Sequence, residues 1–263
     1  MEIIVTSDYE EMSAVSAKII AREIQKKHDL VLGLATGDTP VGTYQHLVKL
    51  HIEQGLDFSK VTSFNLDEYV GLAPIHKNSY NYFMRENLFK HINISPAKVH
   101  VPQGNTSDPE EYCTWYEQQI KMAGGIDLQV LGIGGDGHIA FNEPGSSFAS
   151  RTRVKALYQQ TIIDNSRFFE KVEDVPRFAI TMGIGTILEA RKVLLIASGE
   201  KKADVVAKFI EGPVTSQITA SALQLHSYVS VVLDKGAASK LERTEYYNWV
   251  RDNKHLVQKQ IGR

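Results

Sequence analysis

Short runs of β-branched and aliphatic residues alternate along this chain with longer amphipathic segments. The first run lies in residues 2–6, and Ser7-Asp8-Tyr9-Glu10 then has the form of a helix capping box. Further strands are predicted at 30–34, 61–66, 126–133, 178–181, 193–197 and 228–233, and further helices at 41–53, 79–89, 200–210 and 240–260. Regular alternation of this kind predicts an α/β fold: a doubly wound, mostly parallel, Rossmann-like sheet with helices on both faces.

The predicted elements follow one another without a linker, a low-complexity stretch or a repeat. We therefore expect residues 1–263 to form a single domain. In open parallel sheets, ligands bind beyond the carboxyl ends of the strands. The segments that follow the apolar runs are accordingly the places to look for chemistry.

Composition narrows the class of protein further. Of the 263 residues, 43% are hydrophobic and 23% charged, which is typical of a globular domain and excludes disorder, collagen and coiled coil. The net charge of -2 gives no basic excess, so we expect neither nucleic acid nor a membrane surface as a partner. The only cysteine is Cys113, and the chain carries neither an apolar signal region nor a run of roughly 20 apolar residues. These features favour a cytoplasmic location.

A turn of small residues follows the strand predicted at 30–34. It contains Gly37, Asp38 and Thr39, and Pro40 is placed to begin a helix. Such a turn aims backbone N–H groups at an anion and is a candidate phosphate site. The alternative is an ordinary strand-to-helix loop in which Asp38 or Thr39 caps the helix. It is not a Walker A loop, because the lysine is missing.

Two adjacent acids, Asp67 and Glu68, follow the strand predicted at 61–66. Side chains alternate in direction along an extended chain, so one of the two can face a pocket while the other points away. A carboxylate placed there could act as a general base. The alternative is a solvated turn.

A glycine-rich segment at 132–145 follows the strand predicted at 126–133. Its start matches GxGxxG, but Pro144 and Gly145 would break a following helix, which argues against a dinucleotide site. The segment holds Asp136, His138 and Glu143, a set suited to acid/base chemistry because a flanking carboxylate fixes the imidazole tautomer. A metal site and a structural histidine are the alternatives, and the scattering of the other histidines disfavours the metal.

Two cations could complete an anion site. Arg167 lies in the segment 165–169, and Lys202 lies at the predicted start of a helix. A cation is unfavourable at a helix N-terminus unless an anion is near, which favours a functional role for Lys202. Both could also be ordinary surface residues.

Five segments together resemble the glucosamine-6-phosphate deaminase family, and the resemblance covers nearly the whole chain. They are LATGDTP at 34–40, FNLDEYVG at 64–71, GHIAFNEP at 137–144, SRTRVK at 150–155 and NSRFF at 165–169. The resemblance implies conversion of D-glucosamine 6-phosphate to D-fructose 6-phosphate and ammonia, in amino-sugar catabolism. Neither a metal nor a cofactor is expected, because proton transfers suffice for this reaction.

The resemblance also implies roles for single residues. Asp67 would move a proton between C2 and C1, and His138 would open the sugar ring with support from Asp136 and Glu143. The phosphate would be held by the loop of Gly37, Asp38 and Thr39 together with Arg167 and Lys202. Asp38 is a departure, because the family usually has Gly or Ser there, and an acid beside a phosphate repels it unless the side chain turns away to cap the helix.

Three further residues match an allosteric site of hexameric family members. Ser146, Arg153 and Lys155 match positions that bind N-acetylglucosamine 6-phosphate between subunits, and residues 240–263 resemble the C-terminal helical extension of those hexamers. We therefore expect a homo-oligomer, a hexamer. Ala156 stands where allosteric members tend to have Thr, which predicts weaker activation. Two other functions share similar folds: 6-phosphogluconolactonase, and sugar-phosphate-sensing domains of regulators, although no helix-turn-helix precedes residue 2.

Overall fold

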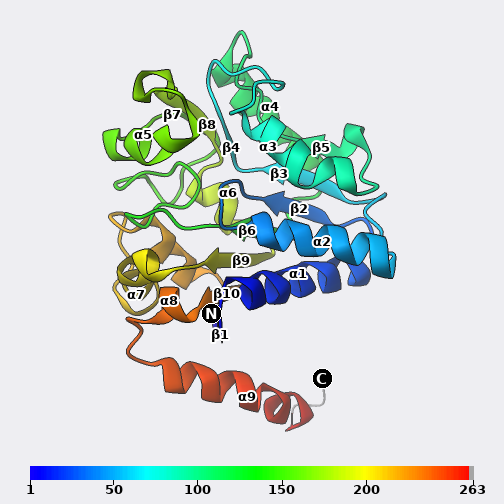
Figure 1. The fold of residues 1–263 in the computed structure, drawn as a ribbon, viewed down its shortest axis with the longest axis vertical. Helices are drawn as coiled ribbons and strands as arrows, with labels where there is room; N and C mark the ends of the chain where they lie inside the picture. The colour runs from blue at the N-terminus through cyan, green and yellow to red at the C-terminus, as the bar shows by residue number, and fades with distance from the viewer. Residues whose placement is uncertain (261–263) are drawn as a thin grey trace.

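Seven parallel strands form the central sheet, as Figure 1 shows for the computed structural model. The structure describes residues 1–260, except for the side chains at 254, 255 and 257–260. Every neighbouring pair of strands is parallel. In spatial order the strands are β1 (Glu2–Thr6), β10 (Val229–Asp234), β9 (Lys192–Ala197), β6 (Leu128–Leu131), β2 (Val31–Leu34), β3 (Thr62–Asn65) and β5 (Val99–His100).

Helices cover both faces of this sheet, because its strands are apolar on both sides. Along β9, Leu194 and Ile196 join one core, while Val193 and Leu195 join the other. The first core includes side chains of α1 (Tyr9–Lys26), α2 (Val41–Gln54) and α3 (Tyr80–Asn87). The second includes side chains of α4 (Pro109–Met122), α6 (Ile184–Leu188), α7 (Ala203–Glu211) and α8 (Lys235–Ala238). The predicted doubly wound sheet is confirmed.

A second, antiparallel sheet corrects one expectation. Residues 178–181 do form a strand, β8 (Phe178–Thr181), but it pairs with β4 (Asp67–Tyr69) and β7 (Arg153–Ala156) and not with the parallel sheet. Leu66 links the two sheets, since its N–H binds Leu34 and its carbonyl accepts the N–H of Met182. In this sheet Thr181 lies between Asp67 and Arg153.

The predicted capping box of α1 is displaced by one residue. Asp8 caps the helix, accepting the N–H of Glu11 at 2.9 Å, and the Glu11 carboxylate accepts the N–H of Ser7 at 2.7 Å. Aspartate caps as well as serine does, so the pattern supports either start. Apart from the last helix, the other elements of the described residues are α5 (Gln159–Asn165) and six short 3-10 helices: η1 (Phe89–His91), η2 (Pro96–Lys98), η3 (Ser166–Phe168), η4 (Val172–Asp174), η5 (Glu200–Lys202) and η6 (Thr219–Leu225).

The last helix, α9 (Thr244–Gln260), packs beside the edge strand β1 and outside the helix–sheet layers (Figure 1). Tyr247 packs against the core and donates its hydroxyl to Glu211, while Tyr246 and Trp249 are exposed. Of the predicted segment 240–263, residues 261–263 lie outside the described residues. No helix in the described part of the chain is long and apolar enough to cross a membrane.

Candidate active site

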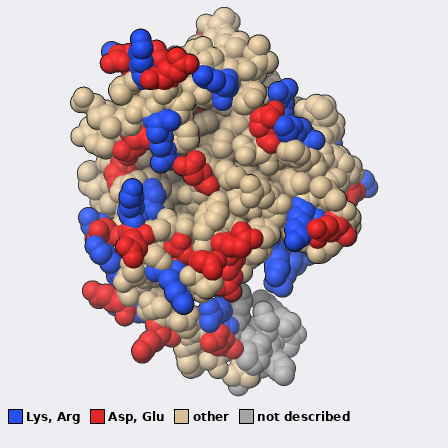
Figure 2. All heavy atoms as spheres, viewed as in Figure 1, with Lys and Arg blue, Asp and Glu red and all other residues tan. Residues whose placement is uncertain are grey.

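The candidate residues come from the carboxyl ends of four neighbouring strands. The four strands lie side by side in the order β3, β2, β6 and β9. Asp67 follows β3, the loop 35–40 follows β2, the glycine-rich loop 132–145 follows β6, and the segment 198–202 follows β9. This is the edge where open parallel sheets bind ligands. Acidic and basic side chains are interspersed on the face shown in Figure 2, without a broad field of one sign.

Asp67 is the first residue of β4 and is only 6% exposed. Its cross-strand partner is Thr181, whose hydroxyl accepts the N–H of Phe141 in the glycine-rich loop. Burial, followed by the nearby charge of Glu68, raises the pKa of Asp67 to about 8. A carboxylate with such a pKa binds protons strongly, which suits a general base near neutral pH.

Glu68 has a different task. Its carboxylate accepts the N–H groups of Tyr69, Tyr80 and Asn81 at 2.9, 3.0 and 2.9 Å, and so holds the first turn of α3. Burial raises the pKa of Glu68, but these three donors oppose the rise by favouring the ionised form. Of the two adjacent acids, Glu68 is thus held by backbone N–H groups and has a structural role, and Asp67 is the candidate general base.

The structure brings the three residues of the carboxylate–imidazole set together. His138 Nδ1 lies 2.7 Å from Asp136 Oδ1 and 3.8 Å from Glu143 Oε2. Burial raises the pKa of Asp136, but hydrogen bonding and the charge of His138 outweigh it and leave that pKa below its ordinary value. Both carboxylates approach Nδ1, so Nε2 is the nitrogen that can reach a substrate.

Glu143 is itself held in place. Its Oε1 accepts the N–H of Tyr158 at 3.1 Å and the hydroxyl of Thr161 at 2.8 Å. Its Oε2 is buried and makes no hydrogen bond within the described residues. A carboxylate fixed through one oxygen, with the other turned to an imidazole, can hold the ring in a defined orientation.

Tight backbone geometry makes room for the imidazole. A Cβ on Gly134 would lie 2.3 Å from His138 Cε1, and Gly137 has a φ of 91°. Ala140 adopts a φ of 51°, a strained conformation for a residue other than glycine. After β6 the next element is β7, so the GxGxxG match opens no helix and lacks the context of a dinucleotide site.

The same three side chains could be considered as metal ligands, because their ligand atoms lie within 4.8 Å of one another. His138 Nδ1 and Asp136 Oδ1 lie only 2.7 Å apart, which is the separation of a close ion pair. Two ligands of a tetrahedral zinc ion lie about 3.3 Å apart, given bonds of about 2.0 Å. The geometry therefore favours an acid/base set.

The anion-site candidates come together only in part. Lys202 Nζ donates to the carbonyl of Ile133 at 2.7 Å, and burial lowers the pKa of Lys202 while the charges of Asp136 and Asp164 oppose this. Gly37 has a φ of 95°, and Thr39 is partly buried. The expectation that Asp38 could cap a helix is wrong: Pro40 is the N-cap residue of α2, no side chain caps it, and Asp38 instead pairs with Arg167 at 2.7 Å.

Two of the three predicted allosteric residues are in contact. An Arg153 nitrogen lies 3.3 Å from Ser146 Oγ, and Ser146 donates to the carbonyl of Glu143 at 2.7 Å. Arg153 has no carboxylate partner in the described part of the chain, and burial lowers its pKa. Lys155 lies two residues along the same strand and thus on the same face.

Sequence reasoning missed two residues that hold the site together. Asn142 accepts a hydrogen bond from Arg153 at 2.9 Å and donates to the carbonyls of Ile139 and Met182. Thr161 binds Glu143 from α5. Asn142 lies in the motif GHIAFNEP at 137–144, so the sequence could have indicated it. Thr161 lies in none of the motifs, and no local pattern marks it.

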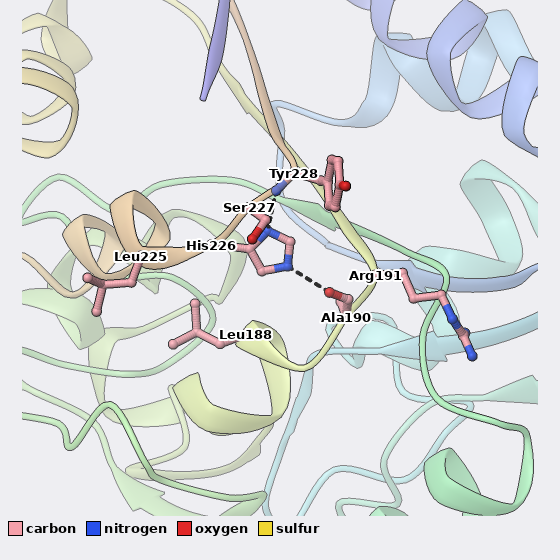
Figure 3. Close-up of a pocket in the computed structure, with 7 residues that line it drawn as sticks. All are labelled: Leu188, Ala190, Arg191, Leu225, His226, Ser227 and Tyr228. Carbon is pink, nitrogen blue, oxygen red and sulfur yellow. Dashed lines mark hydrogen bonds between the residues drawn. The ribbon is translucent and has the colours of Figure 1, made fainter. Parts of the chain in front are cut away.

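A separate cavity of about 310 Å³ lies at the opposite, amino-terminal edge of β9 and β10, as Figure 3 shows. Both ring nitrogens of its histidine, His226, are hydrogen-bonded to backbone groups. One lies 2.7 Å from the carbonyl of Ala190, and the other accepts the N–H of Tyr228 at 3.0 Å. Both polar positions of the ring are used structurally. This cavity therefore presents no free acid/base group from that histidine.

The fold and the site define a class: an α/β protein with a buried acid and an imidazole–carboxylate set beside a candidate anion site. The chain belongs to the family of glucosamine-6-phosphate isomerases and 6-phosphogluconolactonases, whose family model matches residues 8–231.

The glucosamine-6-phosphate deaminase 2 of Bacillus subtilis (strain 168) is 53% identical over 249 residues, covering 94% of this chain and all of that relative. A solved monomeric glucosamine-6-phosphate deaminase superposes with a TM-score of 0.90 at 47% identity, over 91% of this chain and all of its own. A 6-phosphogluconolactonase from Trypanosoma cruzi gives a TM-score of 0.72 at 25% identity, over 92% of this chain and 97% of its own.

The buried state of Asp67 predicts a pH-dependent gain in stability for Asp67→Asn. Because the pKa is near 4 in the unfolded chain and about 8 in the folded one, the folded state binds the extra proton between these values. The free energy of unfolding therefore falls as pH rises through this window, and the neutral amide avoids that loss. In urea denaturation, Asp67→Asn should be more stable than wild type by at least about 1 kcal/mol at pH 8.5, and by less at pH 5.

Asp29→Asn is the matched control, since Asp29 is exposed beside Lys27, and its stability should differ little from that of wild type at either pH. An equal effect of Asp67→Asn at both pH values would contradict the raised pKa.

Proposed function

We propose that this chain converts D-glucosamine 6-phosphate and water to D-fructose 6-phosphate and ammonia, a step of amino-sugar catabolism. The proposal is carried by the buried Asp67 together with the set of His138, Asp136 and Glu143, whose loop bonds to Thr181, the cross-strand partner of Asp67. Relatives that bear the deaminase name at about half identity over nearly the whole chain support it.

Ring opening is the first step. The anomeric hydroxyl must lose a proton and the ring oxygen must gain one, which a single imidazole can do at both atoms. His138 has Nε2 free for this exchange, while Asp136 and Glu143 stabilise the protonated ring from the Nδ1 side. The product is the open-chain 2-amino aldehyde.

Isomerisation and loss of ammonia follow. Asp67 removes the C2 proton, which the adjacent carbonyl acidifies, and returns a proton to C1. The C–H bond at C2 breaks while the carbonyl oxygen at C1 gains a proton, which gives the enolamine. A new C–H bond then forms at C1, the amino group loses a proton, and the 2-imine results. Water adds to this imine, and the carbinolamine releases ammonia. Every step is a proton transfer or a hydration, so the residues present suffice.

The phosphate is held by backbone N–H groups of the loop of Gly37, Asp38 and Thr39, together with the side chains of Arg167 and Lys202. The loop follows β2 and Lys202 follows β9, so both lie at the carboxyl edge of the sheet. A planar guanidinium can bind two phosphate oxygens at once, and the Lys202 ammonium adds a point charge. Binding energy from the phosphate can then orient the reacting carbons.

The test of the reaction is ammonia release by the purified chain. With glucosamine 6-phosphate we expect ammonia and fructose 6-phosphate in equal amounts. Glucosamine without its phosphate should be turned over far less well, because the anion site then contributes nothing. Hydrolysis of 6-phosphogluconolactone with no ammonia from the amino sugar would instead favour the lactonase, and binding without turnover would favour a sensing domain.

A second prediction separates ring opening from isomerisation. His138→Gln should lower kcat/KM on the cyclic sugar by about 100-fold or more, because an amide cannot shuttle the proton. The loss should be smaller on an open-chain analogue, which needs no ring opening. His28→Gln, an exposed position, is the control. Equal losses on both substrates would contradict the role given to His138.

We further propose that an allosteric effector regulates this chain. Arg153, which pairs with no carboxylate among the described residues, lies beside Ser146, and with Lys155 it could bind the phosphate of N-acetylglucosamine 6-phosphate. Arg153 also contacts Asn142 in the catalytic loop and is separated from Asp67 only by Thr181. An anion bound at Arg153 could thus affect Asp67, because the two residues pair with the same residue, Thr181, on neighbouring strands. Ala156 lacks the hydroxyl that a threonine would offer the effector, so we expect the activation to be weaker.

The assembly proposed here is a homohexamer in the cytoplasm, with residues 240–263 as its C-terminal helical extension. Tyr246 and Trp249 of α9 are 60% and 63% exposed, which suits a helix that meets another subunit. The single buried thiol of Cys113 suits a reducing compartment. A solved homologue with 47% identity is monomeric, so the family includes a monomeric form.

We expect N-acetylglucosamine 6-phosphate to shift the substrate saturation curve to lower concentration, because an activator must prefer one of two states. Light scattering should give the mass of six chains. A monomer, or a curve that the effector leaves in place, would overturn the regulatory part while leaving the catalytic part intact.

A further inference from the structure

Asp38 and Arg167 form an ion pair at the candidate phosphate site. Arg167 is in η3, Asp38 is in the loop after β2, and a guanidinium nitrogen lies 2.7 Å from Asp38 Oδ2. The two side chains are 62% and 65% exposed. The one guanidinium expected to bind the phosphate therefore already holds a carboxylate of its own chain.

Neighbouring residues position both partners. The Tyr9 hydroxyl donates to the Asp38 carbonyl at 3.2 Å and accepts the N–H of Gly42 at 2.8 Å, which ties the loop to α1. The Arg167 guanidinium lies over the ring of Phe168, 4.7 Å from its centroid. Because Asp38 does not cap α2, its carboxylate has no competing structural partner at the helix start.

We propose that Asp38 is an affinity-determining residue that competes with the substrate phosphate for Arg167. This inference rests on the proposed function for the identity of the substrate, but not for the binding of an anion. A phosphate can bind both guanidinium nitrogens only after the carboxylate has moved aside. The bound phosphate then still meets the negative charge of Asp38, which weakens its binding further.

The competition has three measurable consequences. First, it weakens every ligand whose anion reaches Arg167, including inorganic phosphate. Second, most of the effect requires Arg167, so removing the carboxylate should give a much smaller gain in phosphate affinity where the guanidinium is absent. Third, it changes the effect of salt: Asp38, Arg167 and Lys202 together carry one positive charge, and two without the carboxylate, so anion binding should become more salt-dependent.

The experiment measures the Kd of inorganic phosphate by calorimetry and the KM of glucosamine 6-phosphate for wild type and Asp38→Asn. The amide keeps the shape of the side chain and removes its charge. Both constants should fall about two- to five-fold at low salt, the effect of an exposed ion pair, and the difference should shrink at high salt. In an Arg167→Ala background, adding Asp38→Asn should change the phosphate Kd by much less.

Asp29→Asn is the matched control, because it removes one exposed carboxylate from an ion pair with Lys27 near the opposite end of β2. Its phosphate Kd should equal that of wild type. An unchanged or weaker phosphate affinity in Asp38→Asn overturns the proposal, as does an equal gain in the Arg167→Ala background. If the wild type releases no ammonia, the proposed function fails, and the phosphate measurements still decide the role of Asp38.

Discussion

The site depends on the burial of one ionisable carboxylate where two sheets meet. The chain leaves β3 through Leu66, whose backbone bonds both to β2 and to the end of β8, and Asp67 then begins the antiparallel sheet. This junction removes the carboxylate from water and raises its pKa to about 8. A base of that strength is obtained at the expense of stability, which is the usual relation between active sites and folds.

The neighbouring acids show how different surroundings give the same carboxylate group different roles. Glu68 is also buried, but three backbone N–H groups hold it. Asp136 is kept easily ionised by His138, and Glu143 is fixed through one oxygen only. Glu68 supports the backbone, Asp67 is the candidate base, and Asp136 and Glu143 contact the imidazole. These roles follow from hydrogen-bond partners and burial, and not from residue type.

Much of the parallel sheet could be predicted, because β2, β6 and β9 are apolar on both sides and the periodicity is strong. The antiparallel sheet could not, since β4 (Asp67–Tyr69) and β7 (Arg153–Ala156) contain charged residues and no apolar run. The contact between Asp136 and His138 follows from their place in one loop. The pairing of Asp38 with Arg167 depends on tertiary placement, and no local pattern in either segment indicates it.

The account is tested most directly by exchange of the C2 proton of glucosamine 6-phosphate with deuterated solvent. Wild type should incorporate deuterium, at a kcat/KM that rises with pH toward about 8, because the base must be ionised. Asp67→Asn should still bind the substrate, as calorimetry can show, and should lose the exchange. Exchange by Asp67→Asn at the wild-type rate would show that the buried carboxylate is not the base.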